Sequence, residues 1–176
     1  ESCLRDADNS KSPIETENQE LFRVKQPLTC GQNKISITIP VDNHRKWDIT
    51  DPYLYDLQVC LWREQETNSR ELCQQEHFRI GFRTMQFDPA RGFLLNGRKV
   101  RLNGACDHHD LGALGAAFHK EAMRRKFELM RSMGVNAVRT SHNMPAVELM
   151  ELADEMGFLI VSEAFDMWEM AKNPYD

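Results

Sequence analysis

The sequence predicts a mixed fold, in which an antiparallel β-sandwich is followed by alternating strands and helices that build a parallel sheet. Two observations predict it. Hydrophobic residues recur with a period of two up to about Arg83, and beyond Arg83 short apolar runs alternate with segments of helical periodicity. The 176 residues, 41% of them hydrophobic and 28% charged, are enough for one or two domains with ordinary cores.

Alternating apolar residues predict the strands of the first region. Ile35–Ile39, Leu57–Leu61 and Phe78–Phe82 each place every second side chain on one face. The polar segment 64–70 predicts the turn before the last of these strands. The first eighteen residues are too polar to predict a core strand.

The second region opens with a predicted hairpin around Asn96-Gly97, because this pair favours the positive φ angles of a type I′ turn. Two helices follow. The first would end at Gly134, and the second would run from about Pro145 to Gly157. Apolar residues at helical spacing would face the core, namely Met123, Phe127, Met130 and Met133 in the first helix and Leu149, Leu152 and Met156 in the second.

Polar side chains follow two short apolar runs that are predicted to be buried strands. One run leads into Arg139 and His142, and the next leads into Glu163 and Asp166. Residues just beyond the carboxyl ends of parallel strands line the ligand crevice in α/β folds, so we expect part of an active-site face here. The βαβ pattern fits either a doubly wound sheet or the opening of a (β/α)₈ barrel.

Composition argues against several classes of protein. The net charge is −5 and the basic residues are scattered, so a nucleic-acid partner has little support. No apolar run approaches the roughly 20 residues that span a bilayer, which argues against a membrane partner. Five cysteines without a CxxC spacing argue against a disulfide framework or a zinc knuckle.

Four motifs, in this order, resemble glycoside hydrolase family 2 and most of all its β-galactosidase type: Asn96-Gly97, Leu102–His108, Asn136–His142 and Asp154–Val161. A looser similarity to the immunoglobulin-like domain of that family covers Trp47, Pro52, Leu54-Tyr55 and Gly81–Arg83. The resemblance implies an N-terminally incomplete immunoglobulin-like β-sandwich domain at residues 1–84. It implies the N-terminal part of a TIM-barrel catalytic domain at residues 85–176.

The resemblance implies a retaining β-glycosidase that hydrolyses O-glycosidic bonds of a β-linked saccharide. In the family, the acid/base Glu follows an Asn after the fourth barrel strand, and the nucleophile follows the seventh. This chain stops at Asp176, shortly after the third, so we expect a fragment that is inactive by itself. β-Galactosidase is the first expectation, and β-glucuronidase and β-mannosidase are alternatives, because Asn143-Met144-Pro145 stands where much of the family has Tyr-Pro.

Roles for the remaining site residues also come from the resemblance. His108 and His142 correspond to histidines that bind sugar hydroxyls and stabilise the transition state, and Arg139 to the arginine that holds the nucleophilic carboxylate ionised. Glu163 would brace the pocket floor, while Asp166, with Trp168 beyond it, would reach the sugar. No metal or cofactor is implied for these residues.

Two rival functions stay open. A metal-dependent barrel hydrolase could use His108, His109, His142, Glu163 and Asp166 as ligands, although such enzymes usually begin with two histidines separated by one residue. Alternatively, the sandwich half could be a non-catalytic carbohydrate-binding or structural module, which should then show exposed aromatic residues. The sequence leaves open whether the full-length enzyme is a homo-oligomer, and whether it is cytoplasmic, periplasmic or secreted.

Overall fold

A computed structural model describes residues 2–6, 20–64 and 69–166 of the chain. The chain forms two compact units. The first unit comprises Glu1–Arg45 and Tyr53–Phe82, and the second comprises Lys46–Pro52 and Arg83–Asp176.

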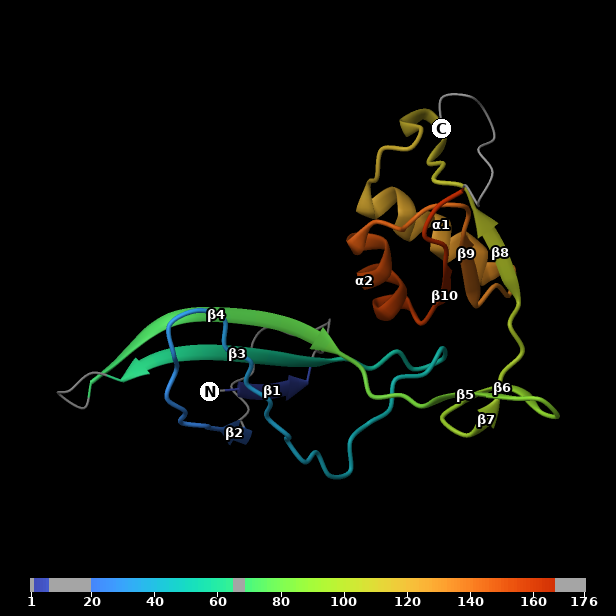
Figure 1. The fold of residues 1–176 in the computed structure, drawn as a ribbon. Helices are drawn as coiled ribbons and strands as arrows, with labels where there is room; N and C mark the ends of the chain where they lie inside the picture. Colours follow the sequence, from blue (N-terminus) through green and yellow to red (C-terminus); the bar gives the residue numbers. More distant parts are fainter. Residues whose placement is uncertain (1, 7–19, 65–68, 167–176) are drawn as a thin grey trace. The chain divides into compact units, whose positions relative to one another are not determined.

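The first unit contains a four-stranded antiparallel sheet in the order β2-β1-β3-β4 (Figure 1). Its strands are β1 (Ser2–Asp6), β2 (Glu20–Phe22), β3 (Tyr55–Glu64) and β4 (Arg70–Ile80). The predictions of a strand around Leu57–Leu61 and of a strand that includes Phe78 are therefore confirmed, while the predicted turn at 64–70 lies largely outside the described residues. The first eighteen residues, which are too polar to predict a core strand, do contain a strand, because β1 pairs with β3 along its whole length.

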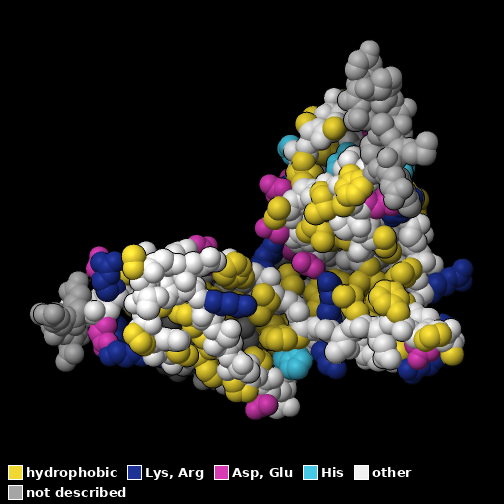
Figure 2. All heavy atoms as spheres, viewed as in Figure 1, with side chains coloured by type: hydrophobic (Ala, Val, Ile, Leu, Met, Phe, Trp, Pro, Cys, Tyr) yellow, Lys and Arg dark blue, Asp and Glu magenta, His cyan; other side chains and the backbone are white. Residues whose placement is uncertain are grey.

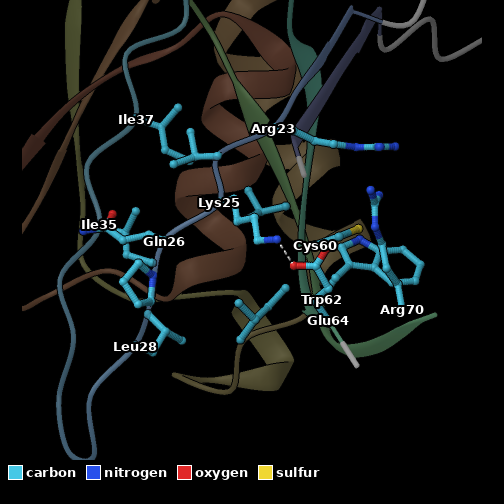
Figure 3. A pocket seen from close by; sticks show the side chains of 14 residues that line it. Arg23, Lys25, Gln26, Leu28, Ile35, Ile37, Cys60, Trp62, Glu64 and Arg70 are labelled. Atoms are coloured by element: carbon cyan, nitrogen blue, oxygen red, sulfur yellow. Dashed lines mark ion pairs between the residues drawn. The ribbon is translucent and has the colours of Figure 1, made fainter. Parts of the chain in front are cut away.

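The predicted strand at Ile35–Ile39 is also wrong, since this segment has no regular secondary structure. Its alternating side chains do share a face: Ile35 and Ile37 line a pocket of about 620 Å³ together with Val59 and Leu61 of β3 (Figure 3). Alternation predicts which side chains lie together, whereas a strand also needs backbone partners. The described part of the chain provides no such partner for this segment.

The pocket in the first unit is lined mainly by aliphatic side chains, with Trp62 as its aromatic member. Lys25 and Glu64 form an ion pair there, and Arg70 lines the same pocket (Figure 3). Because aliphatic side chains dominate, the lining is typical of one inner face of a β-sandwich. The described residues show only one sheet of the predicted sandwich.

The second unit contains a parallel sheet in the order β10-β9-β8 with two helices packed against it (Figure 1). Its strands are β8 (Gly104–Asp107), β9 (Ala137–Thr140) and β10 (Leu159–Ser162), and its helices are α1 (Lys120–Ser132) and α2 (Val147–Met156). A short 3₁₀ helix, η1 (Gly112–Leu114), follows β8. The strand–helix–strand–helix–strand order confirms the predicted βαβ units, and the described strands form an open sheet rather than a closed barrel.

The core of the second unit lies between the sheet and the two helices. Val138 of β9 is fully buried and packs against Phe127 of α1 and Leu152 of α2. Met123, Met130 and Leu149 are buried as predicted, and Met156 packs against the same cluster. Met133 is 72% exposed, contrary to the prediction, because it is the residue that caps α1 and lies beyond its last turn.

Gly134 ends α1 as the sequence predicts. Its φ is +82°, its N–H donates to the Arg131 carbonyl at 2.8 Å, and the Val135 N–H donates to the Met130 carbonyl at 3.0 Å. These two bonds form a Schellman motif, which favours glycine because its left-handed conformation strains residues with a Cβ.

The segment Lys46–Pro52 packs in the second unit, although the resemblance assigns Trp47 to the first domain. Trp47 is 1% exposed, and its Nε1–H donates to the Asp154 carbonyl of α2 at 2.8 Å. The Arg83 guanidinium lies 4.6 Å from the centre of the indole ring. At Gly157, which ends α2 with a φ of +71°, an added Cβ would lie 2.5 Å from the Ile49 carbonyl oxygen. Residues 46–52, called the clasp below, therefore pack against the C-terminal end of α2.

A small antiparallel sheet, formed by β5 (Met85–Asp88), β6 (Gly92–Leu95) and β7 (Arg98–Lys99), precedes the parallel sheet. The φ angles of Asn96 and Gly97 are +52° and +80°, which confirms the predicted type I′ hairpin. The Asn96 side chain donates to the Trp47 carbonyl at 2.9 Å and so ties the hairpin to the same clasp. Among the described residues, none of the helices combines the length and the apolar character that crossing a membrane requires.

Candidate active site

The strand register places Arg139 on the open face of the parallel sheet. Cys106, Arg139 and Val161 occupy matching positions on β8, β9 and β10. Side chains alternate across a sheet, and Val138 faces the helices, so these three project from the opposite face. Val161 is 50% exposed there, and hydrophobic side chains also show on the surface of this unit in Figure 2. In a complete barrel, this face would be the interior.

Glu163, just beyond β10, is the centre of the site. Its Oε1 accepts hydrogen bonds from Nε of Arg139 at 2.7 Å and lies 2.6 Å from Nη2 of the same guanidinium. Its Oε2 lies 3.2 Å from Nδ1 of His142. The backbone N–H of Glu163 donates to Oγ1 of the buried Thr140 at 3.3 Å. One carboxylate therefore holds a guanidinium and an imidazole side by side.

The rings of His108 and His142 meet edge to face, with centroids 5.5 Å apart and an angle of 79° between their planes. His108 follows β8, and His142 follows β9 across a cis peptide bond from Ser141. His108 is exposed, and the His142 side chain is 41% exposed, so both rings are open to a ligand. The imidazoles and the Arg139 guanidinium lie at the carboxyl ends of neighbouring strands.

The structure thus brings together four of the five residues predicted for the site: His108, Arg139, His142 and Glu163. Asp166 is half-buried and lies three residues beyond Glu163, at the edge of the described residues. Its contact with sugar stays a prediction, and Trp168 lies outside the described residues.

Charge complementarity keeps the Arg139–Glu163 pair ionised. The hydrogen bond from Arg139 lowers the pKa of Glu163 below its ordinary value of 4.5; partial burial opposes this shift, while the charge of Arg139 and the bond to His142 add to it. The bond to Glu163 raises the pKa of Arg139, and the contact of Nη1 with Sγ of Cys106 at 3.8 Å adds to it.

This shift predicts a pH-dependent stability. Because Glu163 has a lower pKa in the folded protein, its ionised form stabilises the fold above about pH 4.5, and that stability disappears as the pH falls through the folded-state pKa. Glu163→Gln should therefore lower the thermal midpoint at neutral pH, and the difference from the unsubstituted protein should shrink in acid. Thermal denaturation of both proteins across this range measures it, and a pH-independent difference would contradict the expectation.

A second charged pair, Asp107 with Lys126, lies beside the site and could not be predicted from the sequence. Asp107, the last residue of β8, is 3% exposed and forms an ion pair with Lys126 of α1. Lysine on a helix is typical of a solvated face, and only the βα packing reveals that this ammonium lies against the strand end.

The ligand set proposed for a metal-dependent hydrolase is not assembled in the structure. No group of three His, Cys, Asp or Glu side chains within residues 2–6, 20–64 and 69–166 could hold a metal ion. His109, in a left-handed conformation with φ +54°, instead lines a pocket of about 290 Å³ with Asp107, Leu111 and Thr140. His109 therefore lines this pocket, whereas His142 bonds to Glu163.

Comparison with known proteins decides the family. Residues 89–172 match the family model described as glycosyl hydrolases family 2, TIM barrel domain, and residues 6–83 match the model described as glycosyl hydrolases family 2. The chain belongs to glycoside hydrolase family 2. This confirms the resemblance seen in the motifs and identifies the parallel sheet as the start of the family's TIM barrel.

Relatives within glycoside hydrolase family 2 carry more than one name. The chain is 44% identical, over 99% of its length, to the β-galactosidase BoGH2A of Bacteroides ovatus, of which it covers 19%. It is 31% identical, over 70% of its length, to a β-glucuronidase of Bacteroides fragilis, of which it covers 17%. The chain thus spans less than a fifth of the length of these curated relatives.

Solved structures of the family have the same fold. A glycosyl hydrolase family 2 member from Bacteroides cellulosilyticus matches 76% of this chain with a TM-score of 0.65 and 38% identity, over 16% of that protein. The β-glucuronidase from Ruminococcus gnavus in complex with a C6-substituted uronic isofagomine matches 70% of this chain with a TM-score of 0.63 and 34% identity, over 20% of that protein.

Proposed function

We propose that this chain is part of a retaining β-glycosidase, and that its second unit forms one side of the sugar-binding pocket. The observation that carries the proposal is the bridge from Glu163 to both Arg139 and His142, with His108 against His142, at the carboxyl ends of β8 to β10. Membership of glycoside hydrolase family 2 supports it.

The geometry suits the chemistry of a retaining enzyme, in which one carboxyl group acts as acid and base and a second, about 5 Å away, attacks the anomeric carbon. A guanidinium has five N–H donors in a fixed fork. Glu163 contacts Nε and Nη2 of Arg139, and Nη1 points to Cys106, so donors on the open side can hold a nucleophilic carboxylate. Such a cation keeps the nucleophile ionised and aimed.

The two histidines suit the binding of sugar hydroxyls. An imidazole offers one donor and one acceptor when neutral, and two donors when protonated. Glu163 accepts at Nδ1 of His142, which would leave Nε2 directed at a ligand, and His108 presents a second ring at right angles. A sugar hydroxyl that lies beside both rings could bond to both, and bonds that tighten as charge develops lower the barrier.

The catalytic pair would come from further along a longer protein. We propose that residues 1–84 belong to an immunoglobulin-like β-sandwich and residues 85–176 to the start of the barrel, with both catalytic Glu residues on later barrel strands. The first sugar we propose is a β-galactoside, because a relative that matches 99% of the chain is named a β-galactosidase. β-Glucuronides are the second, because other relatives are named β-glucuronidases.

A panel of 4-nitrophenyl glycosides tests this function. The full-length protein should hydrolyse the β-galactoside faster than the β-glucuronide or the β-mannoside and release the sugar with retained anomeric configuration, as followed by proton NMR. The 176-residue chain alone should release no nitrophenol. Inverted product, or turnover by the 176-residue chain, would contradict the proposal. A faster rate on the β-glucuronide would change the proposed sugar but not the proposed retaining mechanism.

A further inference from the structure

We propose that Lys126, on helix α1, is a positioning residue that holds both sugar-binding histidines in place. This inference rests on the proposed function. The inference rests on one juxtaposition. The Lys126 ammonium joins α1 to Asp107 and to the loop after β8, and Asp107 also accepts a hydrogen bond from Ser141, the residue that follows β9.

Lys126 fixes the His108 loop at both of its ends. Its Nζ forms an ion pair with the Asp107 carboxylate and donates a hydrogen bond to the Asp110 carbonyl at 2.7 Å. Asp107 directly precedes His108, and Asp110 follows His109. The two histidines between these anchors therefore have little freedom to shift as long as the ammonium is in place.

Asp107 carries the same restraint to the second histidine. Its carbonyl oxygen accepts a hydrogen bond from the N–H of Ser141 at 2.9 Å, and Ser141 directly precedes His142. Asp107 and Ser141 are each 3% exposed, so neither can exchange this bond for water without movement of the backbone. Lys126 thus acts on His108 through Asp107, and on His142 through Asp107 and Ser141.

Removal of the ammonium would leave the buried Asp107 carboxylate without its cation. An uncompensated buried charge is strongly unfavourable, so the carboxylate would move toward water and shift the loop of residues 107–110. The edge-to-face contact between His108 and His142 would then be lost. A displacement of about 1 Å of binding groups can reduce the rate of an enzyme by about 100-fold.

The same helix provides a matched control. Glu155, whose side chain is 8% exposed, pairs with Lys120 at 3.2 Å and with Arg124 at 2.9 Å. This cluster also joins α1 to a buried carboxylate, but that carboxylate lies on α2. Neither of its two bonds involves residues 107–110 or Ser141-His142. The double variant Lys120→Met/Arg124→Met therefore removes a comparable interaction from α1 without releasing the site.

Four variants of the full-length protein test the proposal: Lys126→Met, Lys126→Arg, Asp107→Asn and the double control. Two readouts are needed, namely steady-state kinetics on the best nitrophenyl glycoside and the rate at which diethyl pyrocarbonate modifies His108 and His142, followed by peptide mass mapping. Lys126→Met should lower kcat/KM by about 10 to 100-fold and change both modification rates. Lys126→Arg should restore most of the activity, because it restores the cation.

The control should lower the thermal midpoint but keep kcat/KM and both modification rates unchanged. If Lys126→Met does not fold, both readouts are taken from Asp107→Asn instead. This variant removes the buried charge together with the ion pair to Lys126. Equal effects of the site variants and the control on both readouts would overturn the proposal and leave Lys126 purely structural. If the unsubstituted protein hydrolyses no glycoside, the proposed function fails, while the histidine labelling still decides the role of Lys126.

Discussion

Replacing His142 with alanine in the full-length enzyme should lower kcat/KM toward its best glycoside by about 100-fold or more, on the order of 3 kcal/mol of transition-state binding. The reason is its position: Nδ1 of His142 is held by Glu163, and its ring meets that of His108. The substitution removes one of two imidazoles that would contact sugar hydroxyls, and it removes the His142 bond from the Glu163 carboxylate.

Steady-state kinetics of the purified variant measures this effect, with His77→Ala as the control. His77 is an exposed histidine on β4 of the first unit, so its removal should leave kcat/KM unchanged. Near-normal kinetics of His142→Ala would remove this residue from the site, and an equal loss in both variants would show that the effect is not local.

Replacing Trp47 with alanine should destabilise the second unit by about 3 to 5 kcal/mol, the usual cost of removing a large buried aromatic side chain. The indole is 1% exposed, donates to the Asp154 carbonyl and lies under the Arg83 guanidinium, so the substitution removes packing, a hydrogen bond and a cation–π contact together. The loss should be greatest at the C-terminal end of α2, where residues 46–52 clasp the helix.

Hydrogen–deuterium exchange of the full-length protein measures this loss locally, since exchange reports the free energy of opening segment by segment. Peptides from α2 and β9 should exchange faster in Trp47→Ala. The matched control is Trp62→Ala, because Trp62 is 39% exposed and lies in the first unit. Unchanged protection of α2 in Trp47→Ala, or the same loss in the control, would contradict the role assigned to the clasp.

Features that depend on local chemistry could be predicted from the sequence. Gly134 and Asn96-Gly97 adopt the positive φ angles expected of them, because few other residues tolerate this conformation. The burial of Phe127 and Leu152 followed from helical spacing. The convergence of Arg139 and His142 followed from the rule that parallel strands present their carboxyl ends at one edge.

Features that depend on distant partners could not be predicted. The alternation at Ile35–Ile39 suggested a strand, but alternation says nothing of a backbone partner. Trp47 bonds to Asp154, which is 107 positions away along the chain, and no local pattern contains that contact. The pairing of Lys126 with Asp107 likewise emerges only when α1 packs against β8.

A crystal structure of the full-length protein with a galactose-type iminosugar inhibitor tests the central claim most directly. We predict that hydroxyls of the bound ring lie within hydrogen-bond distance, about 3 Å, of both His108 and His142. Arg139 should donate to a carboxylate beneath the anomeric position. An inhibitor bound away from the carboxyl ends of β8, β9 and β10, or a pocket in which these three side chains contact neither sugar nor carboxylate, would contradict the account.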